Sequence, residues 1–300
     1  MSREQKREVA RGYLLLLLSV PFGALFYLTI DTVFGRYAGV TEGQAILCAV
    51  LSGLVISLPF VTINPTLRRK FGYTIRRHKL AVAISAGIEL ATTWAWFYAF
   101  NLSSADIMAF LDQTTLVWAW ILGIVFLRER FSSPMMLSIG IAVVGFTILS
   151  QIQGTYSYLS VALVTLAAFL AAVNSLVIKK FAPDIEGFLF ATAVSIIFIV
   201  FHAAIVWGLG QLSLPPMPAV LLLAAAECCW LFSITCYNQA HRYLPIRTIG
   251  AAGLLEPVVV LAAVWLIGTS VVGTEKIVGA ALIVVGLLAY SWIEISDPEH

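Results

Sequence analysis

The stretch GFLFATAVSIIFIVFHAAIVWGL, residues 187–209, contains no Asp, Glu, Lys or Arg. A helix needs about 20 consecutive, mostly apolar residues to cross the hydrocarbon core of a bilayer, and this stretch is long enough. Similar stretches recur along the whole chain, at residues 12–34, 43–63, 79–100, 103–127, 134–151, 157–178, 218–239, 245–267 and 273–293. The sequence therefore predicts an all-α polytopic membrane protein with ten transmembrane helices. Nine or eleven helices would require one fused or one split span.

The composition supports the same class of protein. Of 300 residues, 60% are hydrophobic and 11% are charged, and the mean hydropathy is +0.95. An average soluble domain is about 25% charged, and part of any soluble globule must face water. This composition excludes a soluble enzyme, a nucleic-acid-binding protein and a disordered chain, and it makes the lipid bilayer the expected surroundings.

Residue patterns typical of catalysis or metal binding are missing from the sequence. The four cysteines, Cys48, Cys228, Cys229 and Cys236, lie in apolar stretches without the paired spacing of a zinc site or a disulfide framework. The four histidines are scattered, and no phosphate-binding loop or nucleophile motif occurs. We therefore predict no catalytic residue, no metal site and no cofactor.

The basic residues divide unevenly between the predicted loops. Arg36 and Lys276 fall on one side of the membrane, and all the other Lys and Arg fall on the other side. Loops rich in Lys and Arg stay in the cytoplasm, so both ends of the chain are predicted to be cytoplasmic. The expected location is the inner (plasma) membrane of a bacterial-type cell.

One predicted connection is unusually basic. Residues 64–78 carry five Lys or Arg interleaved with Leu67, Phe71, Tyr73 and Ile75. A calmodulin-like site and a lipid-binding site are both alternatives. We favour an ordinary interfacial loop that rests on anionic lipid.

The chain contains an internal repeat. A shift of 141 residues places Ser138 on Gly279 and Gly145 on Gly286, with the same gap between the two small residues. Residues 1–151 and 152–300 then hold five predicted spans each, and an odd number makes the second copy enter the membrane from the opposite side. Two inverted five-helix repeats are a common plan of secondary transporters, which alternate access by exchanging the conformations of their halves.

Several segments are landmarks of this repeat: residues 127–130 (LRER), 138–145 (SIGIAVVG), 256–257 (EP), 267–268 (IG) and 22–23 (FG). They resemble the repeat of the drug/metabolite transporter superfamily in its EamA-type branch. Leu116 stands where that family has a proline in the first copy, and residues 268–270 lack its usual Glu. The resemblance implies a ten-span secondary transporter of small metabolites, and its motifs do not specify the cargo.

Acidic residues inside the predicted spans are the main chemical signal. They are Asp31, Glu89, Asp112, Glu227 and Glu256. A charge at the bilayer centre costs about 2.5–3.5 kcal/mol even on the mildest scale, and no Lys or Arg lies at the same depth. These acids are expected to be protonated, or to face a water-filled cavity or a bound cation. Asp31 lies near the outer end of its span and can reach the headgroups.

Aromatic and polar residues accompany four of these acids. Aromatic rings beside carboxylates suit an organic cation, through cation–π attraction and charge pairing. The predicted residues for substrate binding or proton coupling are Glu89, Asp112, Glu227, Glu256, Trp96, Trp230, Thr93, Tyr237, Asn174 and Tyr27. Because no basic residue is expected in the cavity, phosphate-bearing cargo is disfavoured.

The function expected from these residues is secondary active transport of a small amine-bearing metabolite, cationic or zwitterionic, with or without coupling to protons. A second hypothesis is an exporter of neutral or aromatic metabolites in which the acids bind only protons. A third, from another class, is a membrane-embedded enzyme that modifies lipids. Any of these would have a small molecule as its partner.

Overall fold

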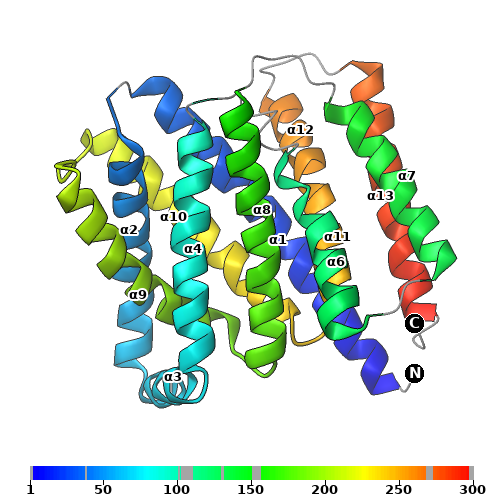
Figure 1. The fold of residues 1–300 in the computed structure, drawn as a ribbon, viewed down its shortest axis with the longest axis horizontal. Coiled ribbons are helices and arrows are strands. Elements are labelled where there is room, and N and C mark those ends of the chain that lie inside the picture. Colours follow the sequence, from blue (N-terminus) through cyan, green and yellow to red (C-terminus); the bar gives the residue numbers. More distant parts are fainter. Residues whose placement is uncertain are drawn as a thin grey trace.

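We describe the protein from a computed structural model. The structure describes residues 3–37, 39–100, 102, 111–129, 132–150, 157–267 and 273–296. Every regular element in these ranges is a helix (Figure 1). The first half contains α1 (Arg3–Arg36), α2 (Glu42–Ile63), α3 (Pro65–Arg77), α4 (Lys79–Phe100), α6 (Thr115–Leu127) and α7 (Ser133–Ser150). The second half contains α8 (Tyr158–Phe181), α9 (Gly187–Gly208), α10 (Met217–Ala240), α11 (Ile246–Ala252), the 3₁₀ turn η1 (Gly253–Leu255), α12 (Glu256–Ile267) and α13 (Thr274–Ser296).

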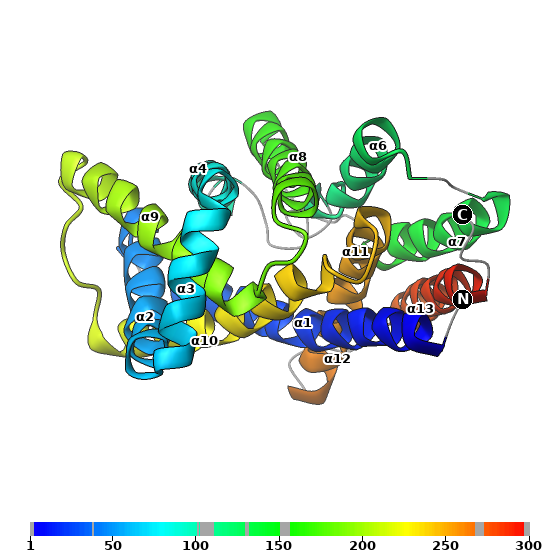
Figure 2. The same ribbon diagram turned by 90° about the horizontal axis from the view of Figure 1, so that it is seen from below.

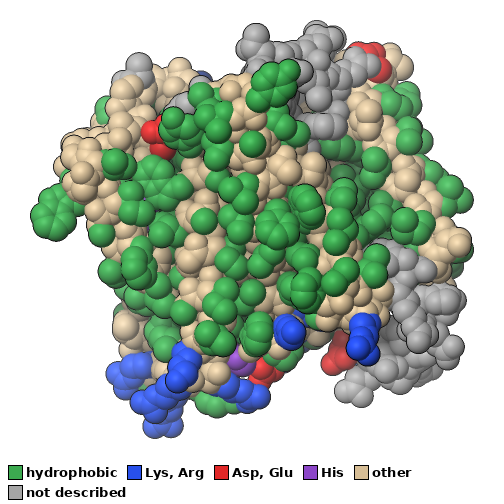
Figure 3. Space-filling view, viewed as in Figure 1, with side chains coloured by type: hydrophobic (Ala, Val, Ile, Leu, Met, Phe, Trp, Pro, Cys, Tyr) green, Lys and Arg blue, Asp and Glu red, His purple; other side chains and the backbone are tan. Residues whose placement is uncertain are grey.

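Eight helical segments in the described part of the chain are long and apolar enough to cross a membrane. Two shorter apolar helices, Thr115–Leu127 and Ser133–Ile148, lie where the fourth and fifth spans are predicted. Apolar side chains are spread over the middle of the face drawn in Figure 3, and Lys and Arg side chains gather along its lower edge. Such a surface is typical of an integral multi-pass membrane protein. The count of ten spans stays a prediction.

Two of the long helices, α2 and α8, begin at a side chain that caps them. Thr41 and Gln44 form a reciprocal capping box at the start of α2. Ser157 accepts a hydrogen bond from the Leu159 N–H at the start of α8. Each cap satisfies backbone N–H groups that the helix itself leaves without a partner.

Residues 64–78, predicted to be a loop, form the helix α3 instead. Asn64 caps α3 by accepting from the backbone N–H groups of Thr66 and Leu67, and Pro65 occupies its first position. The segment is too short and too basic to cross a membrane, and for this reason it was predicted to be a loop. A helix of 13 residues that lies on the surface needs only one apolar face, which this segment has. Phe71 provides part of that face by packing against the cluster around Val82 and Ile178.

The long helices pack in pairs that join the two halves of the sequence. α1 packs along α10, α4 packs along α8, and α7 packs along α13. Figures 1 and 2 show α7 and α13 side by side at one edge of the molecule. The start of α1 and the end of α13 lie at the same end of the molecule as α3 (Figure 1).

The α7–α13 contact is close because both helices carry glycine there. A Cβ at Gly145 would lie 2.6 Å from the Gly279 carbonyl oxygen, and a Cβ at Gly286 would lie 2.6 Å from the Ser138 carbonyl oxygen. The 141-residue shift of the repeat relates Gly145 to Gly286 and Ser138 to Gly279, so it converts the first contact into the second. The packing of α7 on α13 is therefore reciprocal.

Two apolar segments are interrupted near the middle of the molecule. The segment that contains Asp112 has a turn at Gln113 and Thr114 before α6 begins. Residues 245–267, predicted as one continuous helix, divide into α11, η1 and α12. Pro257 lacks the N–H that would bond to the carbonyl of residue 253, which favours a break at this point. The break faces the turn of the other half, because a Cβ at Gly253 would lie 3.0 Å from the Gln113 Oε1 atom.

Candidate substrate-binding cavity

A cavity of about 290 Å³ lies between helices of both halves. It is lined by residues of α1, α2, α4, α8, α9, α10, α11 and η1, together with the segment just before α6 and the first residues of α6 and α12. Its lining includes nine of the predicted site residues: Glu89, Thr93, Trp96, Asp112, Asn174, Glu227, Trp230, Tyr237 and Glu256. The tenth, Tyr27, lies on α1, and its side chain is outside the described residues, as is that of Asp31.

Glu89 and Glu227 form one acidic pair in the cavity. Glu89, on α4, accepts a hydrogen bond of 2.9 Å from the Asn174 side chain of α8. Glu227, on α10, is 5% exposed and lies against Gly53 of α2, where a Cβ would come within 2.7 Å of its carboxylate oxygen. The two carboxylates interact electrostatically. α4 and α10 therefore bring two acids that are far apart in sequence to the same part of the cavity.

Asp112 and Glu256 form a second acidic pair at the two helix breaks. Asp112 precedes the turn before α6, and Glu256 is the first residue of α12. The Gln113 side chain donates a hydrogen bond to Glu256, which also interacts electrostatically with Asp112. Gly23 of α1 leaves room for Glu256, because a Cβ there would lie 2.6 Å from its Oε1 atom.

Aromatic side chains lie close to both pairs. Trp230 packs its ring against Phe26, with 4.9 Å between the centroids. Tyr237 shares a hydrogen bond of 3.0 Å with Ser175 and interacts electrostatically with Glu89, Asp112 and Glu256. Tyr237 therefore connects the two acidic pairs.

Three buried oxygens at the cavity lack a hydrogen-bond partner among the described residues: Thr92 Oγ1, Asn174 Oδ1 and Asn238 Oδ1. All three residues line the cavity. A buried acceptor without a donor is unfavourable, and native structures satisfy nearly all such groups. A ligand rich in N–H donors would satisfy these oxygens.

The electrostatics of the cavity are one-sided. Four acids line it, and none of the described lining residues is Lys, Arg or His. In a site of low dielectric, an anionic cargo would be repelled and a cationic one attracted. No group of three or more His, Cys, Asp or Glu placed to hold a metal ion occurs in the described part of the chain.

Several residues that contribute to the site could be found only in part from sequence patterns. Gln113 and Asn238 were not among the predicted site residues, although each lies near a predicted acid in sequence or on the same helix. Gly23 and Gly53 make room for carboxylates that follow more than 150 residues later in the chain. A sequence pattern can find an acid in a span, but it cannot show which glycine of which helix faces that acid.

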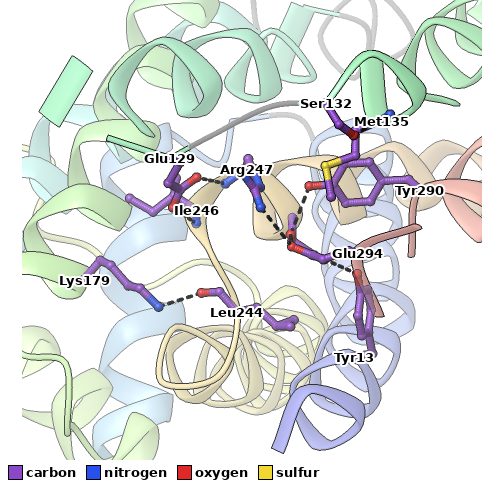
Figure 4. A network of polar contacts seen from close by, with 11 residues as sticks. Tyr13, Glu129, Ser132, Met135, Lys179, Leu244, Ile246, Arg247, Tyr290 and Glu294 are labelled. Carbon is purple, nitrogen blue, oxygen red and sulfur yellow. Dashed lines mark hydrogen bonds and ion pairs between the residues drawn. The ribbon is translucent and has the colours of Figure 1, made fainter. Parts of the chain in front are cut away.

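A polar network is drawn in Figure 4. It joins the ends of helices that lie toward the end of the molecule carrying α3 in Figure 1. On each of three helices, the network residue lies nearer to this end than the residues that line the cavity. These network residues are Tyr13 of α1, Lys179 of α8 and Arg247 of α11. Glu129, which follows α6, accepts hydrogen bonds from the backbone N–H groups of Ile246 and Arg247 at the start of α11. An acid at the start of a helix satisfies orphan donors and interacts favourably with the helix dipole.

The same network includes the end of α13. Glu294 accepts hydrogen bonds from Tyr13 of α1 and Thr248 of α11, and its carboxylate lies 3.8 Å from the Arg247 guanidinium. Lys179 donates to the carbonyl oxygens of His241 and Leu244 at 2.7 Å each. The network therefore joins α1, α6, α8, α11 and α13 beneath the cavity.

Comparison with known proteins supports the fold alone. No protein-family model matches the sequence, and no curated protein matches it. A solved structure described as "Crystal structure of protein" superposes with a TM-score of 0.76 at 12% sequence identity, over 97% of this chain and 99% of that chain. The whole arrangement of helices is therefore similar to that of a protein with a very different sequence.

Proposed function

We propose that this protein is a secondary active transporter of the drug/metabolite transporter type, EamA branch, which moves a small amine-bearing metabolite by alternating access. The cavity between the two halves is its substrate site. The cargo is cationic or zwitterionic, and its ammonium group is bound by the carboxylates of the cavity.

The observation that carries this proposal is the set of four acids in one cavity without a basic residue among the described lining. Several buried carboxylates near one another are costly unless protons or a cation neutralise them. An ammonium group supplies both a positive charge and three N–H donors. The unpaired oxygens of Thr92, Asn174 and Asn238 favour a donor-rich cargo over a proton alone.

The aromatic side chains support an organic cation in particular. Trp96, Trp230 and Tyr237 line the same cavity as the acids. The face of an aromatic ring attracts an ammonium group, and the attraction grows when water is excluded. Phosphate-bearing cargo would need basic partners, which the described lining does not provide.

The reciprocal packing supports two related, inverted halves, residues 1–151 and 152–300. α1 on α10 corresponds to α8 on α4 under the repeat, and the Gly145 contact corresponds to the Gly286 contact. The interruptions at Gln113 and at residues 253–255 also correspond. Interrupted helices at the middle of the membrane are a recurrent feature of transporter binding sites.

The polar network supports a state in which one end is closed. If the end with most of the basic residues is cytoplasmic, Glu129 and Glu294 hold the halves together on that side, because Glu129 bonds to the start of α11 and Glu294 bonds to Tyr13 of α1. Release of cargo to the cytoplasmic side would require these hydrogen bonds to break. The network would then act as the inner closure of the transport cycle.

The test starts with a thermal-shift screen of purified protein against primary amines, amino acids, neutral aromatic metabolites and sugar phosphates. A ligand at 100 times its Kd stabilises the folded state by about 2.7 kcal/mol, which the screen would detect. The strongest amine is then measured for uptake into proteoliposomes. We expect Glu89→Gln and Glu227→Gln to abolish uptake while the protein stays folded, because glutamine keeps the size and removes the charge.

Glu275→Gln is the matched control, since Glu275 is exposed and outside the cavity. Normal uptake in both cavity variants and in their double mutant would refute the proposal. Stabilisation by neutral aromatic compounds but by no amine would instead favour the hypothesis in which the acids bind only protons. Turnover of a lipid during the assay would favour a membrane-embedded enzyme.

A further inference from the structure

The helix α3 differs from every long helix of the molecule in direction and in charge. Figure 1 looks along the axis of α3, whereas α2, α4 and α9 run up the same view, so α3 lies across their ends. It packs against all three. Its sequence, PTLRRKFGYTIRR, contains five basic residues and no acid. A helix of this kind lies in the plane of the membrane interface.

Two of the five cations of α3 are neutralised by the connection between α8 and α9. Lys70 lies 2.7 Å from Glu186, and Arg77 lies 3.2 Å from Asp184. The other three, Arg68, Arg69 and Arg76, are exposed and form no ion pair with any described residue. These three guanidinium groups give α3 a concentrated positive charge. Lys and Arg side chains gather at the lower left of Figure 3, where Figure 1 places α3.

The free guanidinium groups surround a notch in the helix surface. Arg68, Gly72 and Arg76 follow one another at intervals of four residues, so they share one face of the helix. A Cβ at Gly72 would meet nothing within 4 Å. The resulting groove is lined by Arg68, Arg69, Gly72, Tyr73, Arg76 and Arg77. Gly72 contributes no side chain to the groove, and four of its six lining residues are arginines.

We propose that this groove binds the phosphate of an anionic phospholipid headgroup, with Gly72 at its floor and Arg68 and Arg76 on either side. Guanidinium groups bind phosphate oxygens through paired hydrogen bonds and charge. The lipid source is favoured over free phosphate because apolar side chains are exposed in the groove and next to the two ends of α3. Tyr73 on α3 and the flanking residues Ile63 and Leu80 are all more than half exposed, as expected at the boundary of the hydrocarbon.

The experiment is native mass spectrometry of the full-length protein in detergent with phosphatidylglycerol, with phosphatidylcholine, or with inorganic phosphate. We expect phosphatidylglycerol to bind at least tenfold more tightly than phosphatidylcholine, and inorganic phosphate to compete only weakly. Arg68→Gln together with Arg76→Gln should weaken phosphatidylglycerol binding by about 25-fold, at roughly fivefold per basic residue near anionic lipid.

Two further variants separate a built site from diffuse charge. Gly72→Leu fills the notch and leaves every charge in place, and we expect it to lose phosphatidylglycerol binding. Leucine improves helix propensity at this position, so the loss would not arise from unfolding. Lys180→Gln together with Arg242→Gln removes the same charge from exposed positions outside α3 and should leave binding unchanged. Equal binding of the two lipids, full binding by Gly72→Leu, or inorganic phosphate binding as tightly as the lipid would each overturn the proposal. The cavity variants do not enter this test, so its outcome is independent of the transport function.

Discussion

The close contact between α7 and α13 predicts a large cost for even the smallest side chain at Gly145. Alanine at position 145 would place its Cβ 2.6 Å from the Gly279 carbonyl oxygen and 2.6 Å from the Leu282 Cβ atom. Non-bonded heavy atoms prefer about 3.5–4.0 Å, so α7 and α13 would have to separate by roughly 1 Å. Overpacking of this kind typically costs about 1–3 kcal/mol. The Gly286→Ala variant should cost a similar amount, because its Cβ would lie 2.6 Å from the Ser138 carbonyl oxygen.

Gly140→Ala is the matched control on the same helix. A Cβ there would meet nothing within 4 Å. Replacement of glycine by alanine inside a helix improves helix propensity by about 1 kcal/mol at any of these positions. The difference between Gly145→Ala and Gly140→Ala therefore isolates the cost of the close contact.

The assay is the thermal melting of each purified variant in the same detergent, followed by intrinsic fluorescence. We expect Gly140→Ala to melt at or above the temperature of the wild type, and Gly145→Ala and Gly286→Ala to melt several degrees below Gly140→Ala. The double variant should lose less than the sum, because separation of the helices by one Cβ makes room for the other. Equal melting of Gly145→Ala and Gly140→Ala would refute the close approach of α7 and α13. A large loss in only one of the two contact variants would refute their equivalence.

Three further outcomes are expected. In a variant without its four native cysteines, Lys276→Cys should react with an impermeant maleimide added outside intact cells and Lys180→Cys should not, and labelling of Lys180→Cys would reverse the orientation. A linear diamine should raise the melting temperature more than a monoamine of the same length, because the cavity holds two pairs of acids; equal shifts would mean that the pairs do not act as two ammonium sites. Glu129→Ala should lower the melting temperature more than Glu129→Gln, because glutamine keeps one acceptor for the two backbone N–H groups of α11. Hydrogen bonds to a charged group contribute about 1.5–3 kcal/mol each. Equal melting of the two variants would mean that these bonds contribute little.

The helices that are continuous and mostly apolar agree closely with the sequence prediction. α9 spans Gly187–Gly208 where residues 187–209 were predicted, and α10 spans Met217–Ala240 where 218–239 were predicted. Prediction was weaker where a helix is interrupted or lies on the surface. The break at residues 253–255 and the helix α3 both occur in segments whose hydropathy does not indicate the direction of the helix axis. A break depends on one proline and its surroundings, and a surface helix depends on the neighbours that cover its apolar face.

The candidate site shows the same division. Glu89, Glu227 and Glu256 could be singled out from the sequence because an acid in an apolar span is costly wherever its helix lies. Their pairing could not be predicted. Glu227 lies against Gly53 and accompanies Glu89 only because α2, α4 and α10 meet around one cavity.

The sequence by itself determined the class of protein, its apolar helices, the uneven distribution of basic residues and the acids within the spans. These are properties of each segment alone, since burial in lipid depends on local hydropathy and not on a partner. Only the tertiary structure decided which acids share a cavity, which glycines make room for them, and that Glu129 and Glu294 join the halves beneath it. These contacts connect residues more than 100 positions apart, and they depend on how the helices pack, which local composition does not encode.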